Sequence, residues 1–176
     1  MLAFEDESGV SERPCVHKTW ALRGRTPIIR SAGAWRKLSL IGTIITDTTL
    51  HRPRLLLTSI RGSADRYTFL RYLRDLKRAR HGRKIMLFWD GLAAHRAAIV
   101  RDCIAQEKHW LRVERMPAYA PELAPPEYLW SAFKQHSGNA DPDFTAVKRQ
   151  VRRARRTMND RDLLCGFLRA STLFDI

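Results

Sequence analysis

The feature that most constrains this chain is a short, almost wholly apolar run that ends abruptly at an acid. Residues 84–89 (KIMLFW) lack the alternation of a half-exposed strand, which predicts a strand buried inside a sheet. Asp90 follows directly. Because side chains at the ends of such strands face the crevice outside the sheet, Asp90 is the first candidate for a functional residue. An acid in this place can also cap the next helix, and spacing alone leaves both interpretations open.

Two further acids stand in comparable positions. Asp6 ends the short apolar run of residues 2–4, and Ser8-Gly9 behind it predicts a turn. Glu127 follows residues 117–126, where four prolines argue against regular structure, and it opens a predicted helix. Each acid alone has a plain alternative, as a solvated surface charge or as a partner of a helix dipole. Together they predict a shared magnesium site, because Mg²⁺ is held by a few carboxylates and water.

The apolar periodicity predicts a single α/β domain over residues 1–176, with a mixed sheet and helices on both faces. Antiparallel strands come first, and helices then alternate with strands. The strands are predicted at 2–4, 19–22, 26–29, 37–46, 54–59, 84–89 and 110–116, and the helices at 65–80, 95–106, 127–135, 143–158 and 160–170.

The charge of the chain points to an anionic partner. It carries 32 Lys and Arg against 18 Asp and Glu, a net charge of +14, and phosphate backbones are the commonest counterpart of such an excess. No apolar stretch is long enough to span a bilayer, so DNA is the expected partner and a membrane is not. The densest basic segment lies on the predicted helix 143–158 and contains Lys148, Arg149, Arg152, Arg153, Arg155 and Arg156.

Cysteine usage favours a reducing compartment. The three cysteines form no C-x-x-C pair, which argues against both a disulfide framework and a zinc knuckle. The N-terminus reads MLAFED, without the apolar core of a secretion signal. We therefore expect a cytoplasmic protein.

Three motifs in order resemble one known family. They are FEDESG at residues 4–9 with TWALRGRTP at 19–27, then WDG at 89–91 with a histidine at 95, then PAYAPELAPPEYLW at 117–130. This set resembles the DDE-superfamily endonuclease domain of mariner-like bacterial insertion-sequence transposases, from about residue 2 to 134. The resemblance implies a ribonuclease-H-like fold and a catalytic triad of Asp6, Asp90 and Glu127.

The same resemblance implies a reaction. Asp6 would bridge two Mg²⁺ ions, with Mn²⁺ as a substitute, while Asp90 and Glu127 would each hold one. The enzyme would nick DNA at the ends of a mobile element by hydrolysis. The freed 3′-hydroxyl would then attack target DNA, without a covalent protein intermediate. A homodimer assembled on DNA is the expected working form.

The chain departs from the family pattern at two points. Ala124 stands where members usually carry Asn before the proline of the third motif. The N-terminal helix-turn-helix region that reads element ends is absent from this sequence, so an upstream reading frame is the expected source of it. Two alternatives therefore stay open: a catalytically impaired DNA-binding remnant, and a ribonuclease-H-type nuclease.

His95 has two interpretations that the sequence does not separate. It lies five residues after Asp90, near the start of a predicted helix. In the functional interpretation, His95 contacts a phosphate or supports the carboxylates of the triad. In the structural interpretation, it caps the helix or packs against it. Trp89 and Trp130 flank triad acids and are expected to pack beneath them.

Overall fold

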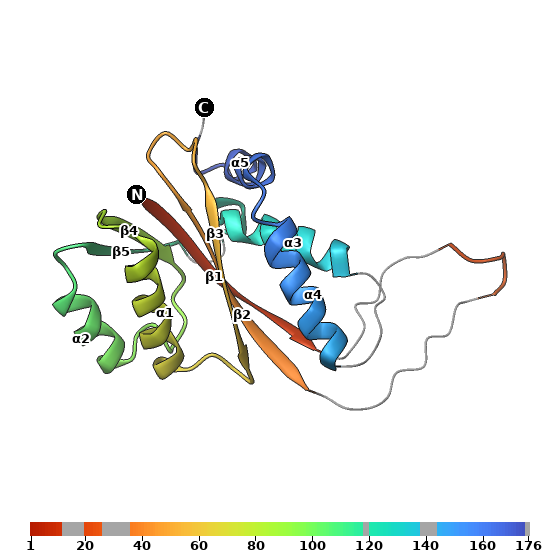
Figure 1. Ribbon diagram of the computed structural model, residues 1–176, viewed down its shortest axis with the longest axis horizontal. Helices are drawn as coiled ribbons and strands as arrows, with labels where there is room; N and C mark the ends of the chain where they lie inside the picture. Colours follow the sequence, from red (N-terminus) through yellow and green to blue (C-terminus); the bar gives the residue numbers. More distant parts are fainter. Residues whose placement is uncertain (12–19, 26–35, 118–119, 138–143, 175–176) are drawn as a thin grey trace.

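The computed structural model describes residues 1–11, 20–25, 36–117, 120–137 and 144–174. Its centre is a five-stranded sheet with the strand order β3-β2-β1-β4-β5 (Figure 1). The first three strands along the chain pair antiparallel, and the last two run parallel to β1. The strands are β1 (Leu2–Ser11), β2 (Lys37–Thr46), β3 (Arg54–Arg61), β4 (Ile85–Trp89) and β5 (Leu111–Arg115).

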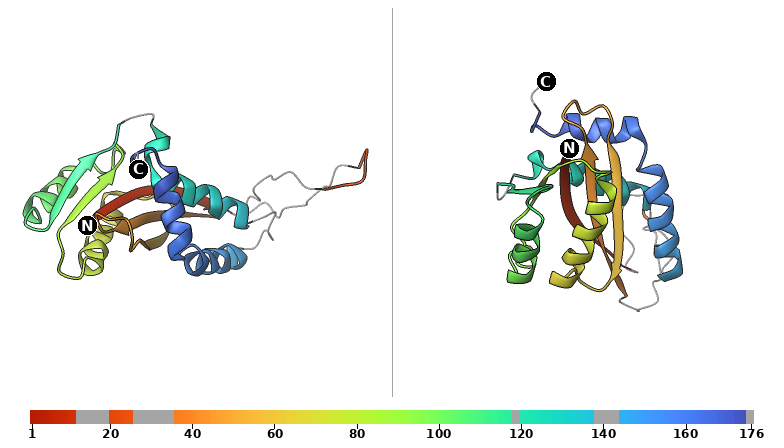
Figure 2. Two further views of the ribbon diagram at one scale, coloured as in Figure 1. Left: turned by 90° about the horizontal axis from the view of Figure 1, so that it is seen from above. Right: turned by 60° about the vertical axis from the view of Figure 1, so that its left-hand side comes forward.

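Helices cover both faces of this sheet, as Figures 1 and 2 show. One face carries α1 (Arg66–Ala79) and α2 (Ala98–Gln106), and the other carries α3 (Pro125–Ser137), α4 (Phe144–Thr157) and α5 (Arg161–Ala170). Each layer has its own core of buried side chains, one between the sheet and α1 with α2, the other between the sheet and α3, α4 and α5. The predicted mixed α/β sheet with helices on both faces is confirmed.

Local sequence explains where several helices begin. Asp65 accepts a hydrogen bond from the backbone N–H of Thr68 at 2.8 Å and caps α1, and Asp160 does the same for α5 through Leu163 at 2.9 Å. In α4 the buried residues recur at helical spacing and leave the basic residues outside. None of the helices within the described residues combines the length and apolar content needed to cross a bilayer.

β1 is longer than the sequence predicted, and this moves Asp6. The apolar run was expected to end at Asp6 with a turn at Ser8-Gly9, but the strand continues to Ser11 because β2 pairs with it along its whole length. Asp6 therefore lies in the middle of a strand rather than at its end. The parallel pairing with β4 stops at Phe4, so among the described residues β1 pairs only with β2 beyond that point.

Three other predicted boundaries were wrong. Residues 20–22 form no strand; the rest of that predicted hairpin, at 19 and 26–29, lies outside the described residues. The second helix begins at Ala98 rather than at 95, since successive turns precede it. The third begins at Pro125, and a short 3₁₀ turn, η1 (Pro121–Leu123), stands before it. Prolines fit a first helical turn because its N–H groups have no partner within the helix.

Candidate active site

The three acids singled out by the sequence line one cleft of about 590 Å³. Asp6 comes from β1, Asp90 follows the last residue of β4, and Glu127 sits in the first turn of α3. They meet because β4 ends beside the middle of β1 and because α3 packs against both β1 and β2. A carboxylate oxygen of Asp6, one of Asp90 and one of Glu7 all lie within 4.8 Å of one another.

The carboxyl group of Asp6 is held in place by a buried tryptophan. The indole Nε1 of Trp130 donates a hydrogen bond of 2.9 Å to Asp6 Oδ2, and the ring is buried. Trp130 in turn lies directly over Gly42 of β2, where an added Cβ would come within 2.6 Å of the ring. The expectation that Trp130 packs beneath a cleft acid is thus confirmed.

The pKa of Asp6 is raised from 3.8 to about 7, chiefly by burial and also by the nearby charges of Glu127 and Glu7, while its hydrogen bonds to the backbone and to Trp130 lower it. A carboxyl group in such surroundings either keeps a proton or needs a cation nearby. Its position in a cleft with two further acids is therefore one that a divalent ion would neutralise.

Two acids that sequence analysis did not select belong to the same cluster. Glu5 and Glu7 flank Asp6 on β1 and project to the opposite face of the strand. Glu5 is only 2% exposed, and within the described residues neither of its carboxylate oxygens has a hydrogen-bond partner. Burial, and then the charges of Glu7, Asp6 and Asp90, raise the pKa of Glu5 well above its usual value. The sequence signal that could have identified Glu5 and Glu7 is the run of three consecutive acids, residues 5–7, within β1.

His95 connects the acids of the two strands. Its Nε2 lies 3.0 Å from Glu7 Oε1, and its Nδ1 lies 3.0 Å from Asp90 Oδ1. The ring is buried, stacks on Trp89 at 4.2 Å between centroids, and meets the edge of Phe69 at 4.3 Å. His95 therefore lies in the turn before α2 and does not cap that helix, whose N-cap is residue 97.

Among the residues that the structure describes, one basic side chain lines the cleft. Arg115, the last residue of β5, lines it and lies over Gly91, where any side chain would overlap the guanidinium group. Asp90 is oriented from the same turn, since its Oδ1 accepts a hydrogen bond of 2.8 Å from the N–H of Leu92. The sequence assigned Arg115 only to a strand, because nothing in its spacing marks it as a neighbour of Asp90.

The basic residues of α4 lie outside this cleft. Five of the six predicted DNA-binding residues are exposed, and Lys148 is half-buried with its ammonium group 5.0 Å from the centre of the Phe144 ring. None of the six lines the cleft. In the described part of the chain they form no ion pair with an acid, so this helix presents an unneutralised positive surface.

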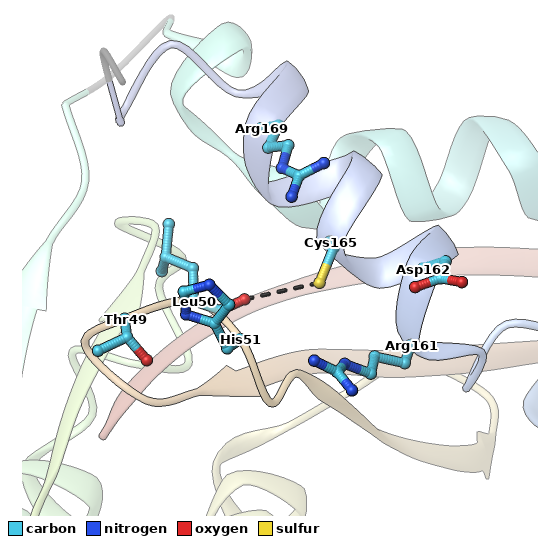
Figure 3. Close-up of a pocket in the computed structure, with 7 residues that line it drawn as sticks. All are labelled: Thr49, Leu50, His51, Arg161, Asp162, Cys165 and Arg169. Atoms are coloured by element: carbon cyan, nitrogen blue, oxygen red, sulfur yellow. Dashed lines mark hydrogen bonds between the residues drawn. The ribbon is translucent and has the colours of Figure 1, made fainter.

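A second hollow, of about 450 Å³, lies between the β2–β3 turn and α5 (Figure 3). The Cys165 thiol donates a hydrogen bond of 3.6 Å to the carbonyl of Leu50 and closes one side of it. Its lining shares no residue with the acidic cleft. It contains the basic side chains of His51, Arg161 and Arg169 with a single acid, Asp162, so it is not a second carboxylate site.

The mixed sheet, the helices on both faces and the acids at its centre define a ribonuclease-H-like α/β domain. The sequence profile described as DDE superfamily endonuclease matches residues 1–162. The chain therefore belongs to the DDE endonuclease superfamily. No curated protein sequence matches it.

Solved structures of the Mos1 mariner transposase share the fold. The Mos1 paired-end complex with the left transposon end is 19% identical with a TM-score of 0.70, and the match covers 97% of this chain and 51% of that one. The paired-end complex with Mn gives 19% identity and 0.71, over 96% and 51%. The Mos1 catalytic domain alone gives 16% and 0.64, over 96% and 75%. This chain thus spans about half the length of the Mos1 chains in those complexes.

Proposed function

We propose that this chain is the catalytic domain of a transposase that cuts DNA and joins its strands, with Asp6, Asp90 and Glu127 as ligands of two Mg²⁺ ions. The observation that carries the proposal is that these acids come from three separate elements and line one cleft. Family membership supports the reaction class. The Mos1 paired-end complexes with Mn and with Mg support the choice of ion.

The residues present fit such ions. The ligands are carboxylate oxygens, which Mg²⁺ and Mn²⁺ prefer, and the pKa of Asp6, raised by burial and by the neighbouring acids, is that of a carboxyl group which a cation would stabilise in its charged form. When bound, two divalent ions supply an activated attacking oxygen and stabilise the leaving oxygen of a phosphodiester. No side chain of the cleft has to form a bond to DNA, so no covalent protein intermediate is needed.

The chain's own residues orient the acids for this role. Trp130 fixes Asp6 through its indole N–H, while the N–H of Leu92 and the ring of His95 fix Asp90. His95 thereby acts as a positioning residue in the proposed reaction. Glu127 is exposed at the start of α3, on the side from which a DNA strand would approach. Rigid placement of ligands matters because a catalytic geometry must be held to within about 0.5 Å.

DNA would be held by backbone-phosphate contacts. The exposed arginines of α4 form the strongest candidate surface, and Arg115 can contact a phosphate inside the cleft itself. Such contacts position DNA without reading its sequence, so recognition of element ends is assigned to a separate helix-turn-helix product. The paired-end complexes of Mos1 support a homodimer assembled on DNA as the working form. A place in the cytoplasm, at the bacterial nucleoid, follows from the same proposal.

The test is nicking of supercoiled plasmid DNA in Mg²⁺ or Mn²⁺. We expect Asp90→Asn to lower the nicking rate by about 10²-fold or more, because Asp90 would hold an ion that stabilises charge developing in the transition state. Asp102→Asn is the matched control, since Asp102 is an exposed acid on α2 outside the cleft. Equal rates for the Asp90 variant and the control would refute the assigned triad.

A catalytically impaired DNA-binding remnant is the second candidate, and Ala124 is the observation that favours it. The carbonyl of Ala124 accepts the N–H of Glu127 at 3.0 Å, but its methyl group offers no further bond to the start of α3. Mn²⁺ titration of the wild type and Asp6→Ala separates the candidates: a working cleft loses Mn²⁺ affinity in Asp6→Ala, whereas a remnant binds Mn²⁺ equally in both. Cleavage of an RNA–DNA hybrid in preference to duplex DNA would instead favour a ribonuclease-H-type nuclease.

A further inference from the structure

We propose that Glu5, Glu7 and His95 form a second metal site, buried beneath the acidic cleft, which binds a divalent transition-metal ion. We call this group the histidine site. It goes beyond the proposed function, because none of its three residues belongs to the triad and its ligands include a nitrogen atom. Its formation does not depend on whether the cleft cuts DNA.

The geometry of the histidine site suits one ion. One ligand atom from each of the three residues lies within 4.8 Å of the others. His95 Nε2 is 3.0 Å from Glu7 Oε1 and 3.7 Å from Glu5 Oε2. Ligand atoms bonded to one ion at about 2.0–2.2 Å stand roughly 3–3.5 Å apart for bond angles between 90° and the tetrahedral value. The observed spacings therefore need only small side-chain movements to accept an ion.

Glu5 provides an independent indication of a missing partner. Its carboxyl group is buried and directed at His95, and neither oxygen meets a hydrogen-bond donor within the described residues. A buried carboxylate without partners is costly, so such a group keeps its proton or pairs with a cation. Glu7 cannot relieve it, because it carries the same charge. A cation between Glu5, Glu7 and His95 satisfies the orphaned oxygens.

The other side of the imidazole ring is arranged as in known metal sites. A metal-bound histidine usually donates its second ring N–H to a carboxylate, which fixes the tautomer and strengthens the ligand. Here His95 Nδ1 lies 3.0 Å from Asp90 Oδ1 and 3.3 Å from the Asp90 carbonyl oxygen, so the tautomer protonated at Nδ1 donates on this side and turns its Nε2 lone pair towards Glu5 and Glu7. Stacking on Trp89 and the edge contact with Phe69 hold the ring in this orientation.

The ligand set selects the class of ion. Imidazole nitrogen with two carboxylates suits Zn²⁺, Mn²⁺ or Fe²⁺, whereas Mg²⁺ prefers oxygen ligands and retains several waters. The triad of the cleft offers oxygen atoms only. A transition ion in the histidine site is therefore distinguishable from an ion in the cleft by its bond to nitrogen.

Pulsed electron paramagnetic resonance with Mn²⁺ as the probe tests this difference. We expect a ¹⁴N coupling to bound Mn²⁺ in the wild-type protein. The coupling should persist in the double variant Asp6→Asn/Glu127→Gln, in which the cleft is impaired, and disappear in His95→Gln. His109→Gln is the matched control, because His109 is an exposed histidine. Absence of the coupling in the wild type, or its persistence in His95→Gln, would overturn the proposal.

A second variant decides the question if the His95 variant does not fold. Glu5→Gln keeps the size of the buried side chain and removes its charge. We expect the metal-free variant to melt no lower than the wild type, while its affinity for Zn²⁺ falls at least about tenfold and the Zn²⁺-induced rise in Tm is lost. Unchanged Zn²⁺ affinity in Glu5→Gln would overturn the histidine site. If the wild-type protein shows the ¹⁴N coupling but does not nick plasmid DNA, the proposed function is wrong and the histidine site stands.

Discussion

The pH dependence of stability offers the sharpest test of the electrostatics of the cleft. The pKa of Asp6 is about 7 in the folded protein against an ordinary value of 3.8. Between these values the folded state holds a proton on Asp6 that the unfolded state has lost. Stability contributed by this group is therefore fully present below pH 3.8 and falls as the pH rises towards 7. Asp6→Asn carries no such proton and should not show this decline.

The size of the effect follows from the shift. The two pKa values differ by about 3, and a pKa difference of 1 corresponds to about 1.4 kcal/mol, which gives roughly 4 kcal/mol of stability. Screening by water around the half-buried carboxyl group reduces this to about 2–4 kcal/mol. In a metal chelator, the stability of Asp6→Asn relative to wild type should thus rise by that amount between pH 4 and pH 8. The amide oxygen of Asn can still accept the bond from Trp130, so packing is retained.

Urea unfolding of both proteins at several pH values measures this difference, and other titrating groups cancel in the comparison. Asp102→Asn, outside the cleft, should follow the wild type at every pH. Addition of Mg²⁺ at pH 8 should stabilise the wild type more than Asp6→Asn. A stability difference between wild type and Asp6→Asn that stays constant from pH 4 to pH 8 would refute the reasoning.

Four other perturbations have defined outcomes. Gly42→Ala places a methyl group against the indole that holds Asp6 and should lower the free energy of unfolding in urea by about 1–3 kcal/mol. Gly166→Ala adds a methyl group in open space on α5 and should raise the same free energy by about 0.5–1 kcal/mol. Ala124→Asn should stabilise the start of α3 by about 1 kcal/mol through an N-cap bond; an unchanged Tm would contradict this. Arg152→Ala with Arg156→Ala should weaken DNA binding regardless of sequence and lower the salt dependence of log K by about 2; an unchanged slope in filter binding would remove α4 from the DNA interface.

Much of the fold was accessible from the sequence because most elements have clear apolar periods. The buried strand before Asp90, the basic helix α4 and the final helix α5 were all predicted near their observed positions. The length of β1 was not predictable in this way. Three acids and a Ser-Gly pair interrupt its apolar pattern, and only pairing with β2 along ten residues keeps it extended.

The residues of the candidate site also divide into those with a local sequence signal and those without one. Asp90 and Glu127 follow recognisable local signals, a strand end and a helix start. Glu5, Glu7 and Arg115 carry no such signal, because their significance depends on which strands are neighbours in space. The environment of His95 likewise depends on contacts with β1, 88 residues away from Glu7 in the chain, and local periodicity cannot report such contacts.

Because the pairing between β1 and β4 ends early, the cleft depends on the packing of both faces of the sheet. A sheet normally insulates its two faces from each other, but past Phe4 carboxylates from both faces of β1 reach the same opening. One face is anchored through Trp130 to the core under α3, and the other through His95 to the core under α1. Loosening of either core would therefore move carboxylates of the proposed ion site, so that metal affinity would report damage in both halves of the molecule.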